Sequence, residues 1–200
     1  MKHLEPLEEA MLERAAAGEA LDLLNESPVP DPMAMESWGQ SQTIRASILQ
    51  YLLTESEWQV SGKGVRLRGV RIKGLLDLEA ARVRCPLQLE DCYLDYSEPV
   101  VLDYAVIPQL ALRRCRLAGI SGDALVITTN LSLTGSIIEG AVVLPGTRIN
   151  GAFRCTGARL GANDLGNSLR CTAMSVRLSV YLDKVVTQGA IVLERADIGG

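Results

Sequence analysis

Aromatic and histidine side chains are scarce in this chain of 200 residues. Only 4% of the residues are aromatic, although 48% are hydrophobic, and His3 is the only histidine. A core with so few rings is best built from stacked rows of similar aliphatic side chains. Because His3 is the only imidazole, general-base and metal-binding roles have almost no histidine to use. The composition therefore favours a narrow aliphatic core and disfavours histidine-dependent chemistry.

Long apolar segments are missing as well. The N-terminal residues hold no apolar stretch of the kind found in secretory signals, and no run reaches the roughly 18 apolar residues of a membrane span. The five cysteines are an odd number, and none of them forms a Cys-x-x-Cys motif. Such cysteines are typical of reduced cytosolic thiols. We predict a cytoplasmic location and no transmembrane segment in this chain.

Phosphate-binding and redox motifs are absent too. Gly64, Gly69 and Gly74 are spaced five residues apart, but no Gly-Lys-Ser/Thr follows them, and no Gly-x-Gly-x-x-Gly precedes a helix. Without these motifs the glycines do not predict a nucleotide or flavin site. We therefore predict no catalytic residue, no cofactor and no metal site, and we favour a protein that is not an enzyme.

The charge is distributed unevenly along the chain. Residues 1–60 carry three basic and eleven acidic residues, a net charge of −8, whereas residues 61–200 carry seventeen basic and thirteen acidic residues, a net charge of +4. The two sum to the overall −4. Any function that needs a long acidic surface on the second region is disfavoured.

What the chain does contain is a repeat, in which large aliphatic residues recur at alternating steps of five and six. Neither an amphipathic helix nor a lone half-buried strand has this period. An eleven-residue repeat with two inward anchors indicates a solenoid, with 22 residues in each coil, in which short strands stack on the coil before. The pattern predicts about six coils, with Leu67 under Leu89 and Ile72 under Leu94. The anchors are Leu67, Ile72, Leu78, Val83, Leu89, Leu94, Leu112, Leu117, Leu133, Ile138, Leu144, Ile149, Leu160, Leu182, Leu193 and Ile198.

The residues that flank the first anchors support this assignment. Alternation along a strand places the anchor inward and its two neighbours outward. All eight flanking positions of the first four anchors are charged: Arg66, Arg68, Arg71, Lys73, Asp77, Glu79, Arg82 and Arg84.

Departures from the repeat predict corners and loops. Residues 97–99 add length at one corner, and residues 161–168 add about five residues that we expect to bulge outward. Glycines between anchors are expected to turn the corners, where φ can be positive; they are Gly69, Gly74, Gly119, Gly135, Gly140, Gly146, Gly151 and Gly157. Small residues two places before alternate anchors fit where the coil is narrow; they are Ala81, Cys92, Ala105, Cys115, Ala158 and Ala196.

Residues 1–60 differ from the rest and predict a helical cap on the first coil. Apolar spacing favours helices over residues 6–24 and 42–55, with Gly18 bending or dividing the first, and with Thr43 or Ser41 as the N-cap of the second. Residues 25–40, which hold three prolines, predict a loop between them. The domains expected are thus a cap segment, 1–60, and a solenoid, 61–200.

The pentads resemble those of the pentapeptide-repeat superfamily, whose fold is a right-handed quadrilateral β-helix. The strict Ala-Asp-Leu-x-x form is rare here, and each pair of pentads carries one extra residue. Residues 43–49 (Thr-Ile-Arg-Ala-Ser-Ile-Leu), followed by the repeat from Gly64 to Leu78, are more similar to bacterial, largely actinobacterial, proteins labelled membrane-associated oxidoreductases. The resemblance covers about residues 41–200. It implies a fold, and it brings no catalytic motif to transfer.

Two groups of side chains invite a functional interpretation. Cys92 and Cys115 lie one coil apart at the same inward position, so they are either a reactive pair or, as we favour, two small hydrophobes in a stacked row. The basic residues of the first three coils could bind phosphates, but acidic residues interleave with them and aromatic residues are nearly absent, so nucleic-acid binding is disfavoured. This basic group is Arg66, Arg68, Arg71, Lys73, Arg82, Arg84, Arg113, Arg114 and Arg116.

The sequence therefore favours a non-enzymatic scaffold or protein-interaction module. The repeat runs to Ala196–Gly200 without a cap, so we expect a protein partner or self-association at the last coil. One alternative is a fragment of a larger protein labelled a membrane-associated oxidoreductase. Another is a pentapeptide protein that mimics DNA and binds gyrase, which the net charge of +4 on residues 61–200 disfavours.

Overall fold

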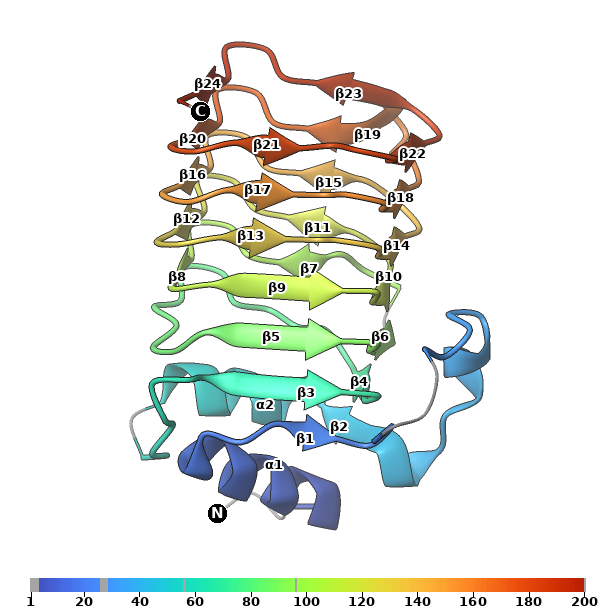
Figure 1. The fold of residues 1–200 in the computed structure, drawn as a ribbon, viewed down its shortest axis with the longest axis vertical. Coiled ribbons are helices and arrows are strands. Elements are labelled where there is room, and N and C mark those ends of the chain that lie inside the picture. The colour runs from blue at the N-terminus through green and yellow to red at the C-terminus, as the bar shows by residue number, and fades with distance from the viewer. Residues whose placement is uncertain (1–3, 26–28, 56, 96, 200) are drawn as a thin grey trace.

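A computed structural model describes residues 4–25, 29–55, 57–95 and 97–199, and it shows a solenoid of parallel strands. Each coil has four short sides, and successive coils stack along one axis (Figure 1). In Figure 1 the chain runs along the near side, returns along the far side and advances toward the C-terminus, so the solenoid is right-handed. The predicted mainly β, quadrilateral parallel β-helix of about six coils is confirmed.

The strands form four parallel sheets, which we number in the order in which each coil visits them. Sheet 1 contains β1 (Leu21–Asp22), β3 (Val65–Arg68), β5 (Leu87–Glu90), β9 (Leu110–Arg113), β13 (Leu131–Ser132), β17 (Phe153–Arg154) and β21 (Val180–Tyr181). Sheet 2 contains β2 (Thr43–Arg45), β4 (Arg71–Lys73), β6 (Tyr93–Asp95), β10 (Arg116–Leu117), β14 (Ile137–Ile138), β18 (Arg159–Leu160) and β22 (Val186–Thr187).

The other two sheets complete each coil from the second coil onward. Sheet 3 contains β7 (Val100–Val101), β11 (Ile120–Ser121), β15 (Val142–Val143), β19 (Asn167–Arg170) and β23 (Ala190–Val192). Sheet 4 contains β8 (Val106–Ile107), β12 (Val126–Ile127), β16 (Arg148–Ile149), β20 (Ser175–Val176) and β24 (Asp197–Ile198). The coils, numbered 1 to 6, cover residues 65–84, 87–107, 110–127, 131–149, 153–176 and 180–198.

The predicted register and the predicted inward positions are confirmed through coil 5. Leu67 pairs with Leu89 and Ile72 with Leu94, so each anchor lies directly over the one below. Every anchor from Leu67 to Leu160 is buried, and the charged residues flanking the first four anchors are half-buried or exposed. The core is therefore a stack of aliphatic rows, as the low aromatic content implied.

The corners are only partly built as expected. Gly69, Gly74, Gly135, Gly146 and Gly157 have positive φ, but Gly119, Gly140 and Gly151 do not. At Gly140 the requirement is space, because a Cβ there would lie 2.8 Å from the Ala118 carbonyl oxygen of the coil below. The corner between sheets 1 and 2 has a left-handed residue in every coil, namely Gly69, Asp91, Arg114, Gly135, Gly157 and Lys184.

Both predicted insertions lie at the corner between sheets 2 and 3. Strands β18 and β19 are separated by residues 161–166, and Leu165 at the tip is exposed. Residues 97–99 are also exposed and lengthen the same corner of coil 2. Extra residues in a solenoid are accommodated at corners because the stacked strands leave no room for them.

The N-terminal segment caps coil 1, but its elements differ from the predicted ones. Helix α1 (Pro6–Ala17) ends before Gly18, which has a left-handed conformation, and β1 follows instead of more helix. Helix α2 (Ala46–Thr54) begins later than predicted because residues 43–45 form β2. The predicted N-cap at Thr43 or Ser41 is wrong, since Arg45 holds that position. Pairing with coil 1 overrides the helix propensity of both stretches.

The described part of the predicted loop contains regular secondary structure. Residues 29–42, which we name the strap, contain two short 3₁₀ helices, η1 (Ala34–Ser37) and η2 (Gln40–Gln42), and lie against the outer face of sheet 2 (Figure 1). Residues 26–28 of that predicted loop, together with His3 and Gly200, lie outside the described residues.

Candidate functional site

The five cysteines are buried thiols, and Cys115 lies one coil above Cys92 in the core, which is the placement that the stacked-row interpretation predicts. The Cys115 thiol donates to the Leu89 carbonyl oxygen at 3.4 Å, and the Cys92 thiol donates to the Leu67 carbonyl oxygen at 3.6 Å. Burial raises the pKa of Cys115 well above its ordinary value, so the reactive thiolate is disfavoured.

Four members of the basic group are held by carboxylates of the protein itself. Arg68 binds Asp22 and Asp91, Arg71 binds Asp95, and Arg114 binds Glu90 and Asp91. Arg116 binds Glu36 and Glu139. These guanidinium groups are occupied, which supports the expectation that they are not a phosphate-binding surface.

Asp91 joins three coils at the corner between sheets 1 and 2. Its buried carboxylate accepts a hydrogen bond from Arg68 Nε of coil 1 at 2.9 Å and one from Arg114 Nε of coil 3 at 2.7 Å. Burial alone would raise the pKa of Asp91, but the hydrogen bonds and charges of the two guanidinium groups outweigh it and lower the pKa. This role is structural, because every oxygen of the carboxylate points to a side chain of the protein.

The strap is fastened to sheet 2 by arginines and by one apolar side chain. Arg71 Nη1 donates to the Trp38 carbonyl oxygen at 2.7 Å, and Arg116 Nη2 lies 2.6 Å from Glu36 Oε1. Met35 is fully buried although it lies outside the solenoid core. Tyr93 lies between Arg71 and Arg116, whose guanidinium carbons are 5.8 and 5.5 Å from the centre of its ring. The strap thus binds through a buried apolar residue followed by a carboxylate.

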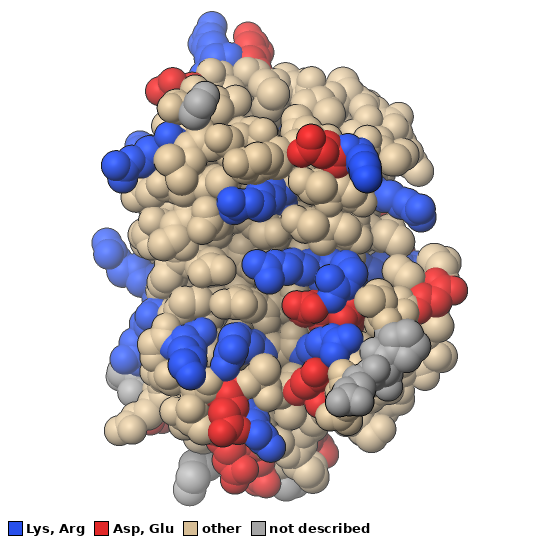
Figure 2. All heavy atoms as spheres, viewed as in Figure 1, with Lys and Arg blue, Asp and Glu red and all other residues tan. Residues whose placement is uncertain are grey.

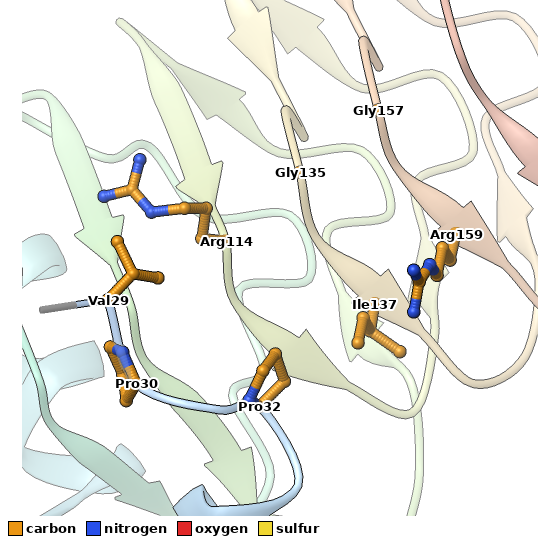
Figure 3. Close-up of a pocket in the computed structure, with 8 residues that line it drawn as sticks. All are labelled: Val29, Pro30, Pro32, Arg114, Gly135, Ile137, Gly157 and Arg159. Atoms are coloured by element: carbon orange, nitrogen blue, oxygen red, sulfur yellow. The ribbon is translucent and has the colours of Figure 1, made fainter.

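A groove of about 300 Å³ lies where the first residues of the strap meet the solenoid, and we name it the strap groove. One wall is formed by Val29, Pro30 and Pro32 of the strap (Figure 3). The rest of the lining comes from coils 3, 4 and 5, namely Arg114, Gly135, Ile137, Gly157 and Arg159.

The open end of coil 6 is the second candidate surface. No residue of 177–199 is buried, and the last anchors, Leu182 and Leu193, are only half-buried, while Ile198 is 40% exposed. In each sheet the strand of coil 6 is the outermost one, so β21, β22, β23 and β24 each have one edge without a neighbour among the described residues. The sequence located this end, but it did not indicate the strap groove, because the groove depends on where the strap lies.

Neither a metal-binding cluster nor a membrane-spanning helix is found among the described residues. Within the described ranges, no group of three or more His, Cys, Asp or Glu side chains is arranged to hold a metal ion. The helices of the same ranges are too short or too polar to cross a bilayer. Figure 2 shows that Lys and Arg side chains lie interspersed with Asp and Glu over the near face, most densely in its lower half.

No family model, curated protein or solved structure matches this chain. The β-helix implied by the resemblance to pentapeptide-repeat proteins is shown by the coordinates, but membership of that superfamily stays a prediction. The same holds for the resemblance to proteins labelled oxidoreductases.

Proposed function

We propose that this protein is a non-enzymatic interaction scaffold whose open coil 6 associates with a second copy of the chain. The observation that carries the proposal is the distribution of exposed apolar side chains. Ile191 and Ile198 of coil 6, which pair with the buried Leu169 and Val176 of coil 5, are 41% and 40% exposed, and the anchors Leu182 and Leu193 are half-buried. Apolar side chains that are exposed together at one end of a fold mark interaction sites.

The backbone of coil 6 supports the same proposal. A strand at the edge of a sheet presents unpaired N–H and C=O groups, and natural proteins normally cover or charge such edges. At the N-terminal end β1 and β2 are also outermost strands, but helix α1 packs against both of them. A second copy meeting coil 6 with its own coil 6 satisfies both edges in a closed pair.

Sedimentation velocity over a range of protein concentrations tests this association. We expect the mass to rise toward that of a dimer in the wild type, and to stay at that of a monomer in Leu193→Glu, which places a carboxylate on the open core. Val106→Glu, which adds the same charge on the outer face of sheet 4, is the matched control and should still dimerise. A wild type that stays monomeric at every concentration overturns the proposal.

The open edge also suits the alternative in which coil 6 is continued by further coils of a larger, oxidoreductase-labelled protein. The native reading frame beyond residue 200, with its neighbouring genes, decides between the two. Further pentads there would favour continuation over self-association. For the DNA-mimic alternative, a gyrase supercoiling assay is the test, and the net charge of +4 on residues 61–200 predicts no effect.

A further inference from the structure

The strap groove exists because two neighbouring coils lack a side chain at one corner. At the corner between sheets 1 and 2, coil 3 carries Arg114 and coil 6 carries Lys184, but coils 4 and 5 carry Gly135 and Gly157. A Cβ added to Gly157 would have no heavy atom of a described residue within 4 Å, so the described part of the chain leaves the space beside it open. We call the gap left by these two glycines the notch, and it is determined by which residue each coil carries at this corner of the repeat.

The row of outward residues on sheet 2 connects the strap to the groove. Tyr93, Arg116, Ile137 and Arg159 occupy successive coils at the same register. The strap covers the Tyr93 and Arg116 end of this row, where Glu36 binds Arg116 and Met35 is buried. The Ile137 and Arg159 end lines the groove and is not covered by the strap (Figure 3).

Arg159 differs from the arginines under the strap in having no carboxylate. Arg71 and Arg116 each pair with acidic side chains, whereas Arg159 makes no ion pair with any residue that the structure describes. Its side chain is exposed at the groove, beside Ile137 and across from Pro32 (Figure 3). A guanidinium next to an apolar wall suits a ligand that combines a carboxylate with an apolar group.

We propose that the strap groove binds a short segment of a partner protein in which an apolar residue precedes an acidic one. The strap is the template, because its own Met35–Glu36 pair is bound in this way by the adjacent coils of the same sheet. In the occupied groove the apolar side chain packs against Ile137 and the two prolines, and the carboxylate pairs with Arg159. The proposal rests on the interaction-scaffold function, but it concerns a different surface from coil 6.

A peptide titration tests the proposal in the Leu193→Glu background, so that self-association at coil 6 does not contribute. The probe is a capped peptide with the sequence of residues 31–38, Asp-Pro-Met-Ala-Met-Glu-Ser-Trp. A second peptide has Gln in place of the Glu. We expect saturable binding of the first, and binding about tenfold weaker both for the Gln peptide and for Arg159→Gln protein, because a charge-assisted hydrogen bond is lost.

Two further variants test whether the notch itself holds the peptide. Gly157→Gln fills the notch and should abolish binding without unfolding the protein, because Arg114 and Lys184 adopt the same left-handed conformation in this corner. Ala173→Gln places an identical side chain at a left-handed corner between sheets 3 and 4, and should bind normally. No binding of the first peptide, or binding that Arg116→Gln weakens and Arg159→Gln does not, overturns the proposal. In the latter case the peptide replaces the strap. Failure here leaves dimerisation through coil 6 untouched, so the two proposals are separable.

Discussion

The two ends of this solenoid have the same strand register but opposite surroundings. At the N-terminal end, β1 and β2 extend sheets 1 and 2 beyond coil 1, and α1 packs Met11, Leu12 and Ala15 into the common core. At the C-terminal end, coil 6 has a neighbouring coil on one side only among the described residues, and its anchors are partly exposed there. A coil is stabilised by the interfaces on both of its sides, so the repeat unit alone does not determine its stability.

Charge reinforces this difference between the ends. The carboxylate of Glu8 in α1 is fully buried and accepts hydrogen bonds from the Arg45 backbone N–H at 3.1 Å and from Arg45 Nε at 2.8 Å, which fastens the helix to β2. Burial alone would raise the pKa of Glu8, but the hydrogen bonds and charge of Arg45 lower it. Every ion pair found among the described residues involves the cap or coils 1 to 3, and Glu139 is the sole partner contributed by coils 4 to 6.

The largest effect on the free energy of unfolding is expected when a core leucine is replaced by alanine, and the same substitution can be compared in two coils. Leu89 and Leu182 belong to the same row, but Leu89 is fully buried in coil 2, whereas Leu182 is half-buried in coil 6. We expect Leu89→Ala to lower the free energy of unfolding by about 3 kcal/mol, and Leu182→Ala to lower it by less than about 1 kcal/mol. Urea titrations of the two variants measure the difference. Equal losses would mean that coil 6 is as well packed as coil 2, and would contradict the comparison.

The second largest effect on the free energy of unfolding is expected at Asp91, the buried corner carboxylate that joins coils 1 to 3. Asp91→Asn keeps the left-handed conformation, which asparagine tolerates, but removes the charge that Arg68 and Arg114 share. We expect a loss of about 2 kcal/mol in the free energy of unfolding at neutral pH. Asp183→Asn, an exposed substitution in coil 6, should change it by less than about 0.5 kcal/mol.

The difference in the free energy of unfolding between the wild type and Asp91→Asn should depend on pH. Because the pKa of Asp91 is lower in the folded protein than its ordinary value of 3.8, its contribution is complete above about pH 4 and is lost as the pH falls through the folded-state pKa. Urea titrations at pH 7 and below pH 4 should therefore show the wild type approaching Asp91→Asn in stability at acid pH. A constant difference at all pH values would contradict an ionised Asp91 in the folded state.

The rate of thiol labelling compares local opening in coils 2 and 3 with local opening in coil 5, and it needs no mutation. Cys92, Cys115, Cys155 and Cys171 are all buried, but only coil 6 protects the last two from the open end. Local opening starts where a segment has the fewest contacts, so we expect Cys155 and Cys171 to react with a thiol reagent before Cys92 and Cys115. Mass spectrometry of partly labelled protein gives the order, and fully denatured protein gives the limiting rate. Simultaneous labelling of all four would indicate a single cooperative unit.

The smallest effect is expected at the corner between sheets 3 and 4. Ala80 in coil 1 and Arg195 in coil 6 both have positive φ, which costs a non-glycine residue roughly 1 kcal/mol. Ala80→Gly relieves this strain and should raise the free energy of unfolding by about 0.5 kcal/mol after the entropic cost of glycine. Arg195→Gly should have no effect on it, because we expect the less buried coil 6 to open before the rest unfolds. Urea titrations check both, and a similar gain at Arg195 would place coil 6 in the main cooperative unit.

The N-terminal segment shows where prediction from sequence stopped. Residues 43–45 and 21–22 look helical because their apolar spacing continues that of the adjacent helices, but they pair with β4 and β3. The competing strand pairing comes from residues of coil 1 that are more than 25 positions away, which local propensity does not include. The missed N-cap has the same origin, since the Arg45 backbone N–H is bound by Glu8 of another helix.

The candidate sites were predictable to different degrees. The anchors of coil 6 could be predicted from the repeat alone, because large aliphatic residues recur as far as Ile198. The strap groove did not, because Met35, Glu36 and Arg116 are close only after a proline-containing segment crosses sheet 2. A signal was present in the sequence: Gly135 and Gly157 occupy the corner position where coils 2, 3 and 6 have Asp91, Arg114 and Lys184.

By itself the sequence determined the four-sided stack, its register, its buried thiols and its insertions. These features depend on contacts between equivalent positions one coil apart, so a period in the sequence is enough to predict them. Only the tertiary structure decided how the first coil is closed, where the strap lies and which arginines keep a free guanidinium. Those features depend on contacts between segments that share no period, and their geometry arises only when the chain has folded.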